Sequence, residues 1–215
     1  MKKILMLTTG GTIASLPSEE GLAPTGADTI LSHMGPSAAN YDITTQEILT
    51  LDSTNIQPEE WKIIAGAIYQ NIRLYDGIVV THGTDTMAYT ASMMSFMLRN
   101  VPIPVVFTGS QVPIASPLSD APLNLTCAFA MAASATPGIF VAFDRKIMLG
   151  CRSVKVRTTA FDAFESVNYP YAGVVDSSGL NLDRSVIPPQ RGECVLEDTV
   201  DSDVYLLKLT PGTNP

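Results

Sequence analysis

Short runs of apolar residues alternate with longer amphipathic stretches along most of the chain. The apolar runs have the length of buried strands, and they cover residues 3–8, 43–51, 77–81, 104–108 and 138–143. Because strands that alternate with helices are joined by right-handed crossovers, this pattern predicts an α/β fold. We expect a doubly wound, mainly parallel sheet with helices on both faces, of the flavodoxin or Rossmann-like type.

The amphipathic stretches predict helices between these strands. The first begins at Pro58, which suits a first helical position because its missing N–H needs no partner there. Its apolar stripe consists of Trp61, Ile64, Ala65, Ile68 and Ile72. The second follows Asp85, and its apolar face consists of Met87, Ala91, Met94 and Leu98. The third extends from about residue 119 to residue 134, with Pro122 in its first turn.

The character of the chain changes after residue 143. Two short strands are predicted at 146–150 and 173–175, and residues 181–203 are polar and rich in turns, as interdomain linkers are. The apolar run 204–209 then has the pattern of a strand that opens another domain. We therefore expect an N-terminal domain over residues 1–180, a linker over 181–203, and over 204–215 the first strand of a smaller C-terminal domain that is otherwise missing.

Composition and charge limit the partners and the compartment. The chain has 215 residues, of which 46% are hydrophobic, and its net charge of -8 repels nucleic acid. The N-terminal apolar run breaks at residues 8–11, too early for a secretory signal, and no run reaches the ~18 residues of a membrane span. We expect a cytoplasmic protein without nucleic-acid or membrane partners, whose widely spaced Cys127, Cys151 and Cys194 are free thiols.

Three polar clusters follow predicted strands, at the edge where a doubly wound sheet binds ligands. They are Thr-Gly-Gly-Thr-Ile-Ala at 9–14, Thr-His-Gly-Thr-Asp-Thr at 81–86 and Leu-Asp-Ser-Thr-Asn at 51–55. Each has an ordinary interpretation alone: the first as a turn, the second as a helix cap at Asp85, and the third as a cap before the helix that begins at Pro58. The first also lacks the glycine spacing and the lysine of phosphate-binding loops. Taken together, the clusters can converge on one pocket.

The threonines of these clusters are candidate nucleophiles. A threonine hydroxyl is a weak nucleophile unless a neighbouring base or cation activates it. Lys155 offers an ammonium group, although a solvated surface charge is its simpler interpretation. His82 is a possible general base, but a lone histidine beside a glycine is more often structural. The sequence has no group of His, Cys and Asp residues at metal-ligand spacing, so we expect neither a metal nor another cofactor.

Together these motifs resemble the bacterial-type L-asparaginases, of the cytoplasmic type I. The resemblance rests on residues 9–14, 81–87, 108–111 and 208–212, and it covers essentially the whole chain. The absence of a secretory signal and the pair Asp52 and Ser53 also fit the cytoplasmic type. The resemblance implies the N-terminal catalytic domain of an amidohydrolase that converts L-asparagine to L-aspartate and ammonia without a cofactor. It also implies that the parent protein is a homodimer or homotetramer.

The resemblance further implies roles for individual residues. Thr12 is similar to the nucleophile that attacks the side-chain amide and forms an acyl-enzyme. Thr84, Asp85 and Lys155 are similar to a second catalytic triad, which polarises the nucleophile or the hydrolytic water. Ser53 and Asp85 would hold the α-carboxylate and the α-amino group of the substrate, with help from Asp52. The remaining substrate-binding positions are Gly11, Ser110 and Leu22.

Two departures from the family pattern leave alternatives open. Many members have a tyrosine in the loop after the first threonine, whereas Leu22 occupies that place here and cannot donate a hydrogen bond to Thr12. The family also completes each site with the C-terminal domain of a neighbouring subunit, which we expect to be missing. The first alternative is an asparagine-binding domain without turnover. The second is a related amidohydrolase, such as a glutaminase or the amidase-like subunit of a tRNA-dependent amidotransferase.

Overall fold

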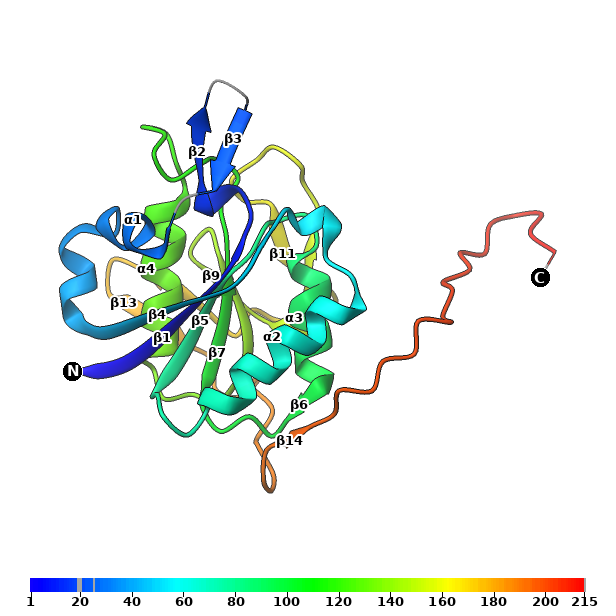
Figure 1. Cartoon of the computed structure of the whole chain (residues 1–215). Helices are drawn as coiled ribbons and strands as arrows, with labels where there is room; N and C mark the ends of the chain where they lie inside the picture. Colours follow the sequence, from blue (N-terminus) through cyan, green and yellow to red (C-terminus); the bar gives the residue numbers. More distant parts are fainter. Residues whose placement is uncertain (19–20, 25, 215) are drawn as a thin grey trace.

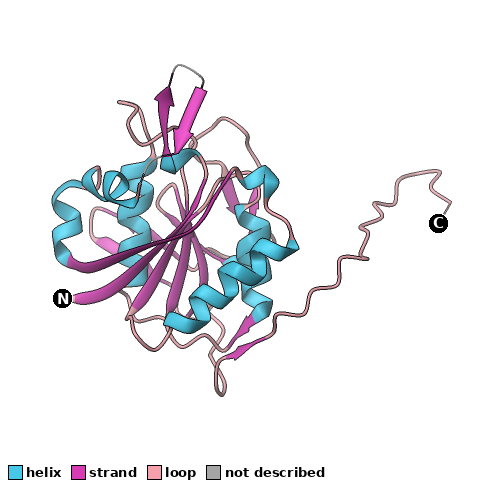
Figure 2. Cartoon of the chain, viewed as in Figure 1, coloured by secondary structure: helices cyan, strands magenta, loops and turns pink. Residues whose placement is uncertain are grey.

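The core of the fold is a parallel sheet. The computed structural model describes residues 1–18, 21–24 and 26–214, and at 14–18, 21–24, 27 and 28 it describes the backbone alone. Across the sheet, β4 (Tyr41–Leu51), β1 (Lys2–Gly10), β5 (Gly77–Thr81), β7 (Pro104–Thr108) and β8 (Gly138–Phe143) are parallel neighbours in this order. This is the flavodoxin-like strand order, so the predicted fold class is confirmed (Figures 1 and 2).

Antiparallel strands extend the sheet beyond β8. These are β9 (Lys146–Leu149), β12 (Gly173–Asp176) and β13 (Gly179–Leu182), and with them the described residues form one eight-stranded sheet. The two short strands predicted after residue 143 are thus present as β9 and β12. Smaller antiparallel pairs are β2 (Ser15–Ser18) with β3 (Gly21–Pro24), and β10 (Ser153–Lys155) with β11 (Phe164–Ser166).

Helices cover both faces of the sheet (Figure 1). On one face, α2 (Pro58–Asn71) and α3 (Met87–Met97) pack against side chains such as Leu5 and Leu7. On the other face, α1 (Ala27–Ser32) and α4 (Ala121–Ala132) pack against side chains such as Ile4 and Met6. Because helices cover both faces, the strands β1, β5, β7 and β8 are apolar on both faces, whereas the edge strand β4 is largely polar. Among the described helices, none is long and apolar enough to cross a membrane.

The predicted helices form at their expected positions. Pro58 opens α2, and the carboxylate of Glu60 accepts a hydrogen bond from the backbone N–H of Gln57 at 2.7 Å. The predicted apolar faces of α2 and α3 belong to the core, although Leu98 follows α3 and lies in β6 (Leu98–Arg99). Short 3-10 helices at Thr12–Ala14, Gly35–Asn40, Ser53–Asn55 and Gly150–Arg152 connect the larger elements.

The C-terminal part of the chain differs from expectation at three places. Residues 181 and 182 belong to β13 in the main sheet, and Val195–Leu196 forms β14, which pairs with β6, so these parts of the expected linker are strands. The strand expected at 204–209 is absent from the described residues, because a strand needs a hydrogen-bonding partner and this segment extends away from the body (Figure 1). The division of the whole protein into domains stays a prediction.

Candidate functional site

The three polar clusters meet at the carboxyl edge of the sheet. The register aligns Thr8 with Thr81 and Thr81 with Thr108, so the loops after β1, β5 and β7 leave the sheet at the same level. Between β1 and β5 the chain order reverses, and open parallel sheets bind ligands at such a point. A Cβ atom on Gly11 would lie 2.5 Å from backbone atoms of Gly83, so the loops after β1 and β5 are in close contact there. The structure therefore brings the clusters together as the sequence predicted.

The glycine at position 83 also brings the third cluster to this point. A Cβ atom on Gly83 would lie 2.6 Å from the Cβ of Ser53, and the backbone N–H of Gly11 donates to the carbonyl of Leu51 at 3.1 Å. The hydroxyl of Thr86 donates to the carbonyl of Ser53 at 2.7 Å. The loop after β4 is thus attached to the loops after both β1 and β5.

Lys155 lies at the centre of the polar contacts in the site. Its Nζ donates to Oγ1 of Thr84 at 2.8 Å and to Oδ1 of Asp85 at 2.7 Å. The Lys155 side chain is only 14% exposed, whereas that of Asp85 is 57% exposed. The interpretation of Lys155 as a solvated surface charge is therefore wrong. The cap interpretation of Asp85 is also wrong, because Thr86 occupies the N-cap position of α3 and the Asp85 carboxylate pairs with the ammonium instead.

Gln111 joins this group, although the sequence pattern assigned it no role. Its Oε1 accepts a hydrogen bond from Oγ1 of Thr84 at 3.1 Å. Its Nε2 donates to the carbonyls of Thr158 at 2.9 Å and Ala160 at 3.1 Å. The sequence did contain a signal, since Gln111 ends the motif at 108–111, but a motif does not show which partner a glutamine side chain reaches.

Two of the predicted substrate-binding side chains already have partners within the protein. Oδ1 of Asp52 accepts hydrogen bonds from the N–H and the hydroxyl of Thr54, both at 2.9 Å, so this carboxylate caps the short 3-10 helix Ser53–Asn55, whereas Gln57 occupies the N-cap position of α2. The buried Ser110 hydroxyl donates to the carbonyl of Val112 at 2.7 Å. Both residues lie in the loops that form the site, and their contact with a substrate stays a prediction.

Thr12 and Leu22 lie in the segment that follows β1. Thr12 begins the short 3-10 helix that follows Gly11, and it is partly exposed. The hairpin of β2 and β3 rises directly after that helix, above the edge of the sheet (Figure 1). Leu22 falls in β3, but its side chain lies outside the described part of the chain, so its predicted place beside Thr12 stays a prediction.

His82 is a buried structural residue. Its Nδ1 lies 2.8 Å from the carbonyl of Gly83, and its Nε2 lies 2.9 Å from Oγ1 of Thr90, which also accepts from Nε1 of Trp61 at 3.1 Å. A carbonyl only accepts, so Nδ1 carries the proton and Nε2 accepts from Thr90. Burial lowers the pKa of His82 from 6.5 to about 4. The neutral ring is thus fully hydrogen-bonded, as the structural interpretation of this histidine predicted.

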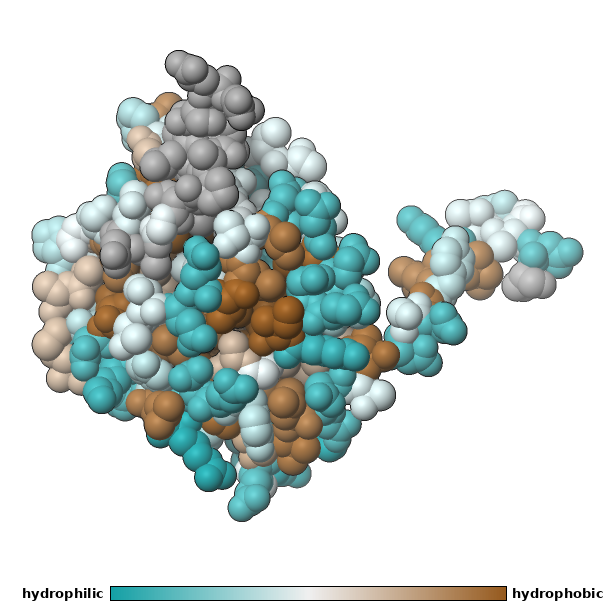
Figure 3. Space-filling model, in the orientation of Figure 1, coloured by the Kyte–Doolittle hydropathy of each residue, from teal (hydrophilic) through white to brown (hydrophobic). Residues whose placement is uncertain are grey.

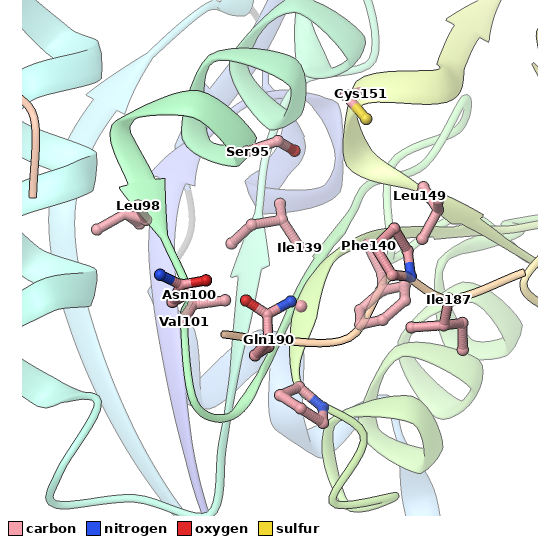
Figure 4. Close-up of a pocket in the computed structure, with 13 residues that line it drawn as sticks. Ser95, Leu98, Asn100, Val101, Ile139, Phe140, Leu149, Cys151, Ile187 and Gln190 are labelled. Atoms are coloured by element: carbon pink, nitrogen blue, oxygen red, sulfur yellow. The ribbon is translucent and has the colours of Figure 1, made fainter. Parts of the chain in front are cut away.

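Two cavities lie near opposite edges of the sheet, and one of them adjoins the candidate site. A cavity of about 500 Å³ adjoins the Lys155 and Asp85 pair and is also lined by Tyr89 and Ser92. A smaller and mostly apolar cavity of about 160 Å³ lies where β8 begins, between the end of α3 and residues 187–190 (Figure 4). The described residues contain no group of three or more His, Cys, Asp or Glu side chains that could hold a metal.

Comparisons with known proteins agree with this geometry. A family model described as "Asparaginase, N-terminal" matches residues 3–188. The L-asparaginase of Thermococcus kodakarensis is 48% identical over 99% of this chain and 65% of its own length, and L-asparaginase 1 of Escherichia coli strain K12 is 35% identical over 98% and 64%. A glutamyl-tRNA(Gln) amidotransferase subunit from Methanosarcina barkeri is 34% identical over 100% of this chain and 54% of its own length.

Solved structures show the same relationship. The thermostable L-asparaginase from Thermococcus kodakarensis superposes with a TM-score of 0.90 at 47% identity, covering 98% of this chain and 65% of that chain. L-asparaginase I from Vibrio cholerae gives a TM-score of 0.87 at 33% identity, covering 99% and 66%. This chain thus spans about two thirds of the length of these relatives. With the family match over most of its residues, the chain belongs to the asparaginase family and contains the N-terminal domain of that family.

Proposed function

We propose that the protein hydrolyses the side-chain amide of L-asparagine to L-aspartate and ammonia through a threonine acyl-enzyme. The contact of Lys155 with both Thr84 and Asp85 carries this proposal, because it places a cation beside the Thr84 hydroxyl, in the loop that packs against Gly11, the neighbour of Thr12. Relatives at 48% and 35% identity carry the name L-asparaginase, which supports asparagine as the substrate.

In the proposed reaction, Oγ1 of Thr12 attacks the carbon of the side-chain amide. A C–O bond forms and the C–N bond breaks, while the hydroxyl proton of Thr12 passes to the departing nitrogen, so that ammonia leaves. Water then attacks the ester and releases aspartate, and a proton returns to Thr12. Lys155 polarises the Thr84 hydroxyl that it contacts. Backbone N–H groups near Gly11 and Thr84 stabilise the negative charge that develops on the amide oxygen, a contribution typically worth ~3 kcal/mol per donor.

We also propose that the whole protein is cytoplasmic and forms a homodimer or homotetramer that contacts neither nucleic acid nor membrane. One similar solved structure is that of a probable cytoplasmic L-asparaginase from Campylobacter jejuni. Exposed apolar side chains on α3, Tyr89 and Phe96, support a subunit interface on this side of the molecule. Analytical ultracentrifugation tests the assembly, and a monomer at micromolar concentration would contradict it.

The test of the reaction is ammonia release from L-asparagine. The wild-type protein is expected to release ammonia, and Thr12→Ala is expected to abolish release while asparagine still raises the melting temperature. Thr126→Ala, on the exposed surface of α4, is the matched control and is expected to keep full activity. A Thr12→Ala variant with wild-type turnover would show that Thr12 is not the nucleophile.

L-glutamine is the second substrate to test, because a relative that covers the whole chain is named as part of a glutamyl-tRNA(Gln) amidotransferase. A pocket that differs by one methylene discriminates by only ~1–3 kcal/mol, or about 10- to 200-fold. A ratio of kcat/KM that favours asparagine supports the proposal. A ratio that favours glutamine assigns the protein to the glutaminase alternative, and binding of asparagine without turnover assigns it to the binding-domain alternative.

A further inference from the structure

Within the proposed function, we infer that Gln111 is a positioning residue for Thr84. It fixes the direction of the Thr84 hydroxyl proton and holds that hydroxyl beside the ammonium of Lys155. Thr84 therefore orients the attacking hydroxyl or water, and it does not itself attack. Gln111 acts through Thr84, so no contact between Gln111 and the substrate is needed.

The orientation of the Gln111 amide follows from its two backbone partners. Its terminal nitrogen lies within 3.1 Å of the carbonyls of both Thr158 and Ala160, and carbonyl oxygens only accept hydrogen bonds. The NH2 group must therefore face these carbonyls. The amide oxygen consequently faces Thr84, 3.1 Å from its Oγ1.

This orientation determines where the proton of Thr84 lies. The amide oxygen of Gln111 only accepts, and the Lys155 ammonium only donates, so Thr84 donates to Gln111 and accepts from Lys155. One lone pair of Oγ1 is left for a further donor. Thr84 can thus accept a hydrogen bond from an attacking hydroxyl or water and so aim it, whereas its own proton is held by a group that cannot act as a base.

The backbone around Gln111 is fixed by a second set of bonds. The carboxylate of Asp120 accepts from the backbone N–H groups of Gln111, at 3.0 and 3.1 Å, and Val112, at 3.1 Å. Asn124 donates to the same carboxylate at 3.0 Å and accepts from the N–H of Asp144 at 2.9 Å. These contacts tie the loop after β7 to the start of α4 and to the end of β8. Gln111 is therefore held in place before any substrate arrives.

Gln111 also links the two segments that carry Thr84 and Lys155. The carbonyls of Thr158 and Ala160 follow β10 within a few residues, and β10 ends at Lys155. Thr84 lies in the loop after β5. One side chain thus links the segment that carries the cation to the hydroxyl that accepts from it, and loss of the link would free both groups to move.

The first test is the steady-state kinetics of Gln111→Met with L-asparagine. Methionine keeps the length of the side chain but removes all three hydrogen bonds, and displacement of a reacting group by about 1 Å lowers kcat by about 10- to 100-fold. KM is expected to stay within about threefold, because Gln111 is not placed to bind the substrate. Gln70→Met, on the exposed face of α2, is the control and is expected to keep wild-type kcat. Wild-type kcat in Gln111→Met, or a raised KM with unchanged kcat, would overturn the inference.

A double-mutant cycle tests whether the effect passes through Thr84. Serine lacks the methyl group that restricts the threonine rotamer, so the hydroxyl in Thr84→Ser depends more on Gln111 for its direction. Gln111→Met is therefore expected to lower kcat more in the Thr84→Ser background than in the wild type. Equal effects in both backgrounds would assign Gln111 a purely structural role and would contradict the inference.

A crystal structure of Gln111→Met separates this inference from the proposed reaction. If the wild type releases no ammonia from either amide, the proposed function fails, but the geometry can still be examined. A rotated Thr84 side chain, or loss of its contact with Lys155, supports the positioning role. An unchanged Thr84 rotamer with the Lys155 contact intact would overturn that role whatever the activity is.

Discussion

Gly11 and Gly83 are in backbone contact: a Cβ atom on Gly11 would lie 2.5 Å from the Cα of Gly83. This contact joins the loop that carries Thr12 to the loop that carries Thr84, at the place where the strand order reverses. Gly11 also has a φ of +80°, which residues with a side chain rarely adopt. The two glycines thus let the predicted nucleophile and the predicted second triad share one site.

Replacement of Gly11 by alanine is expected to destabilise the fold and disrupt the site. The added methyl group meets backbone atoms that cannot move aside, and the positive φ adds strain, so the free energy of unfolding should fall by about 2 kcal/mol or more. Gly66→Ala is the matched control: an added Cβ there meets nothing within 4 Å, and alanine favours the helix by about 1 kcal/mol. Urea unfolding measures both, and equal stabilities of the two variants would contradict the close contact.

Lys155→Met is expected to remove activity but little stability. The variant loses the cation that contacts Thr84, so kcat should fall by about 100- to 1000-fold. The pair with the half-exposed Asp85 contributes little to folding, so the free energy of unfolding should change by less than about 1 kcal/mol. Lys62→Met, an exposed lysine on α2, is the control for loss of a positive charge. A large fall in the free energy of unfolding without a loss of kcat would show that Lys155 has a structural role and not a catalytic one.

The sequence predicted most of the sheet, because buried parallel strands are apolar on both faces and leave a clear pattern. It also predicted that the three polar clusters would converge, since strand ends of one sheet share an edge, and the contacts among Gly11, Gly83 and Ser53 agree with this. Both predictions combine a local apolar pattern with the rule that the strands of a doubly wound sheet end at the same edge. The helix faces around Ile64 and Met94 follow from the same kind of pattern.

The remaining features depend on contacts between distant segments. The strand β13 has only four residues, too few for a clear pattern, yet it pairs with β12 and extends the sheet. Gln111 reaches Thr84 and Ala160, which lie 27 and 49 residues away in sequence, through a side chain whose direction no local pattern encodes. The run 204–209 is apolar enough for a strand, but no neighbouring strand among the described residues supplies its hydrogen bonds.

The extended segment at 204–209 is expected to be the first site of proteolysis. Tyr205 and Leu206 are 87% and 89% exposed, and they lie on backbone without helix or sheet hydrogen bonds. Figure 3 shows apolar residues on this extended segment. Chymotrypsin should therefore cut after these residues before it cuts at Tyr89 or Phe96, which are exposed on α3. Mass spectrometry of a time course identifies the product. A Tyr205→Ser and Leu206→Ser double variant should delay this cut, and early cleavage within α3 would contradict the expectation.

The buried His82 is expected to make folding stability depend on pH. Burial lowers its pKa from 6.5 to about 4 in the folded protein, so between these values the unfolded chain binds a proton that the folded chain does not. The contribution is complete above about pH 6.5 and is lost as the pH falls towards about 4. The full lowering of the pKa corresponds to about 3 kcal/mol.

Urea unfolding between pH 7 and pH 4, followed by the fluorescence of Trp61, measures this dependence. Trp61 is the single tryptophan of the chain and donates a hydrogen bond to Thr90, the partner of His82, so its emission reports on this part of the core. In His82→Asn, an amide nitrogen can still donate to the carbonyl of Gly83, but no group titrates. The variant should therefore start less stable and lose less stability on acidification, because its folded and unfolded states bind the same number of protons at this position. His33→Asn, at an exposed position, should keep the wild-type slope. If His82→Asn also kept that slope, the acid sensitivity would arise from the carboxylates. The pKa of His82 would then not be lowered in the folded protein, which would contradict the expectation.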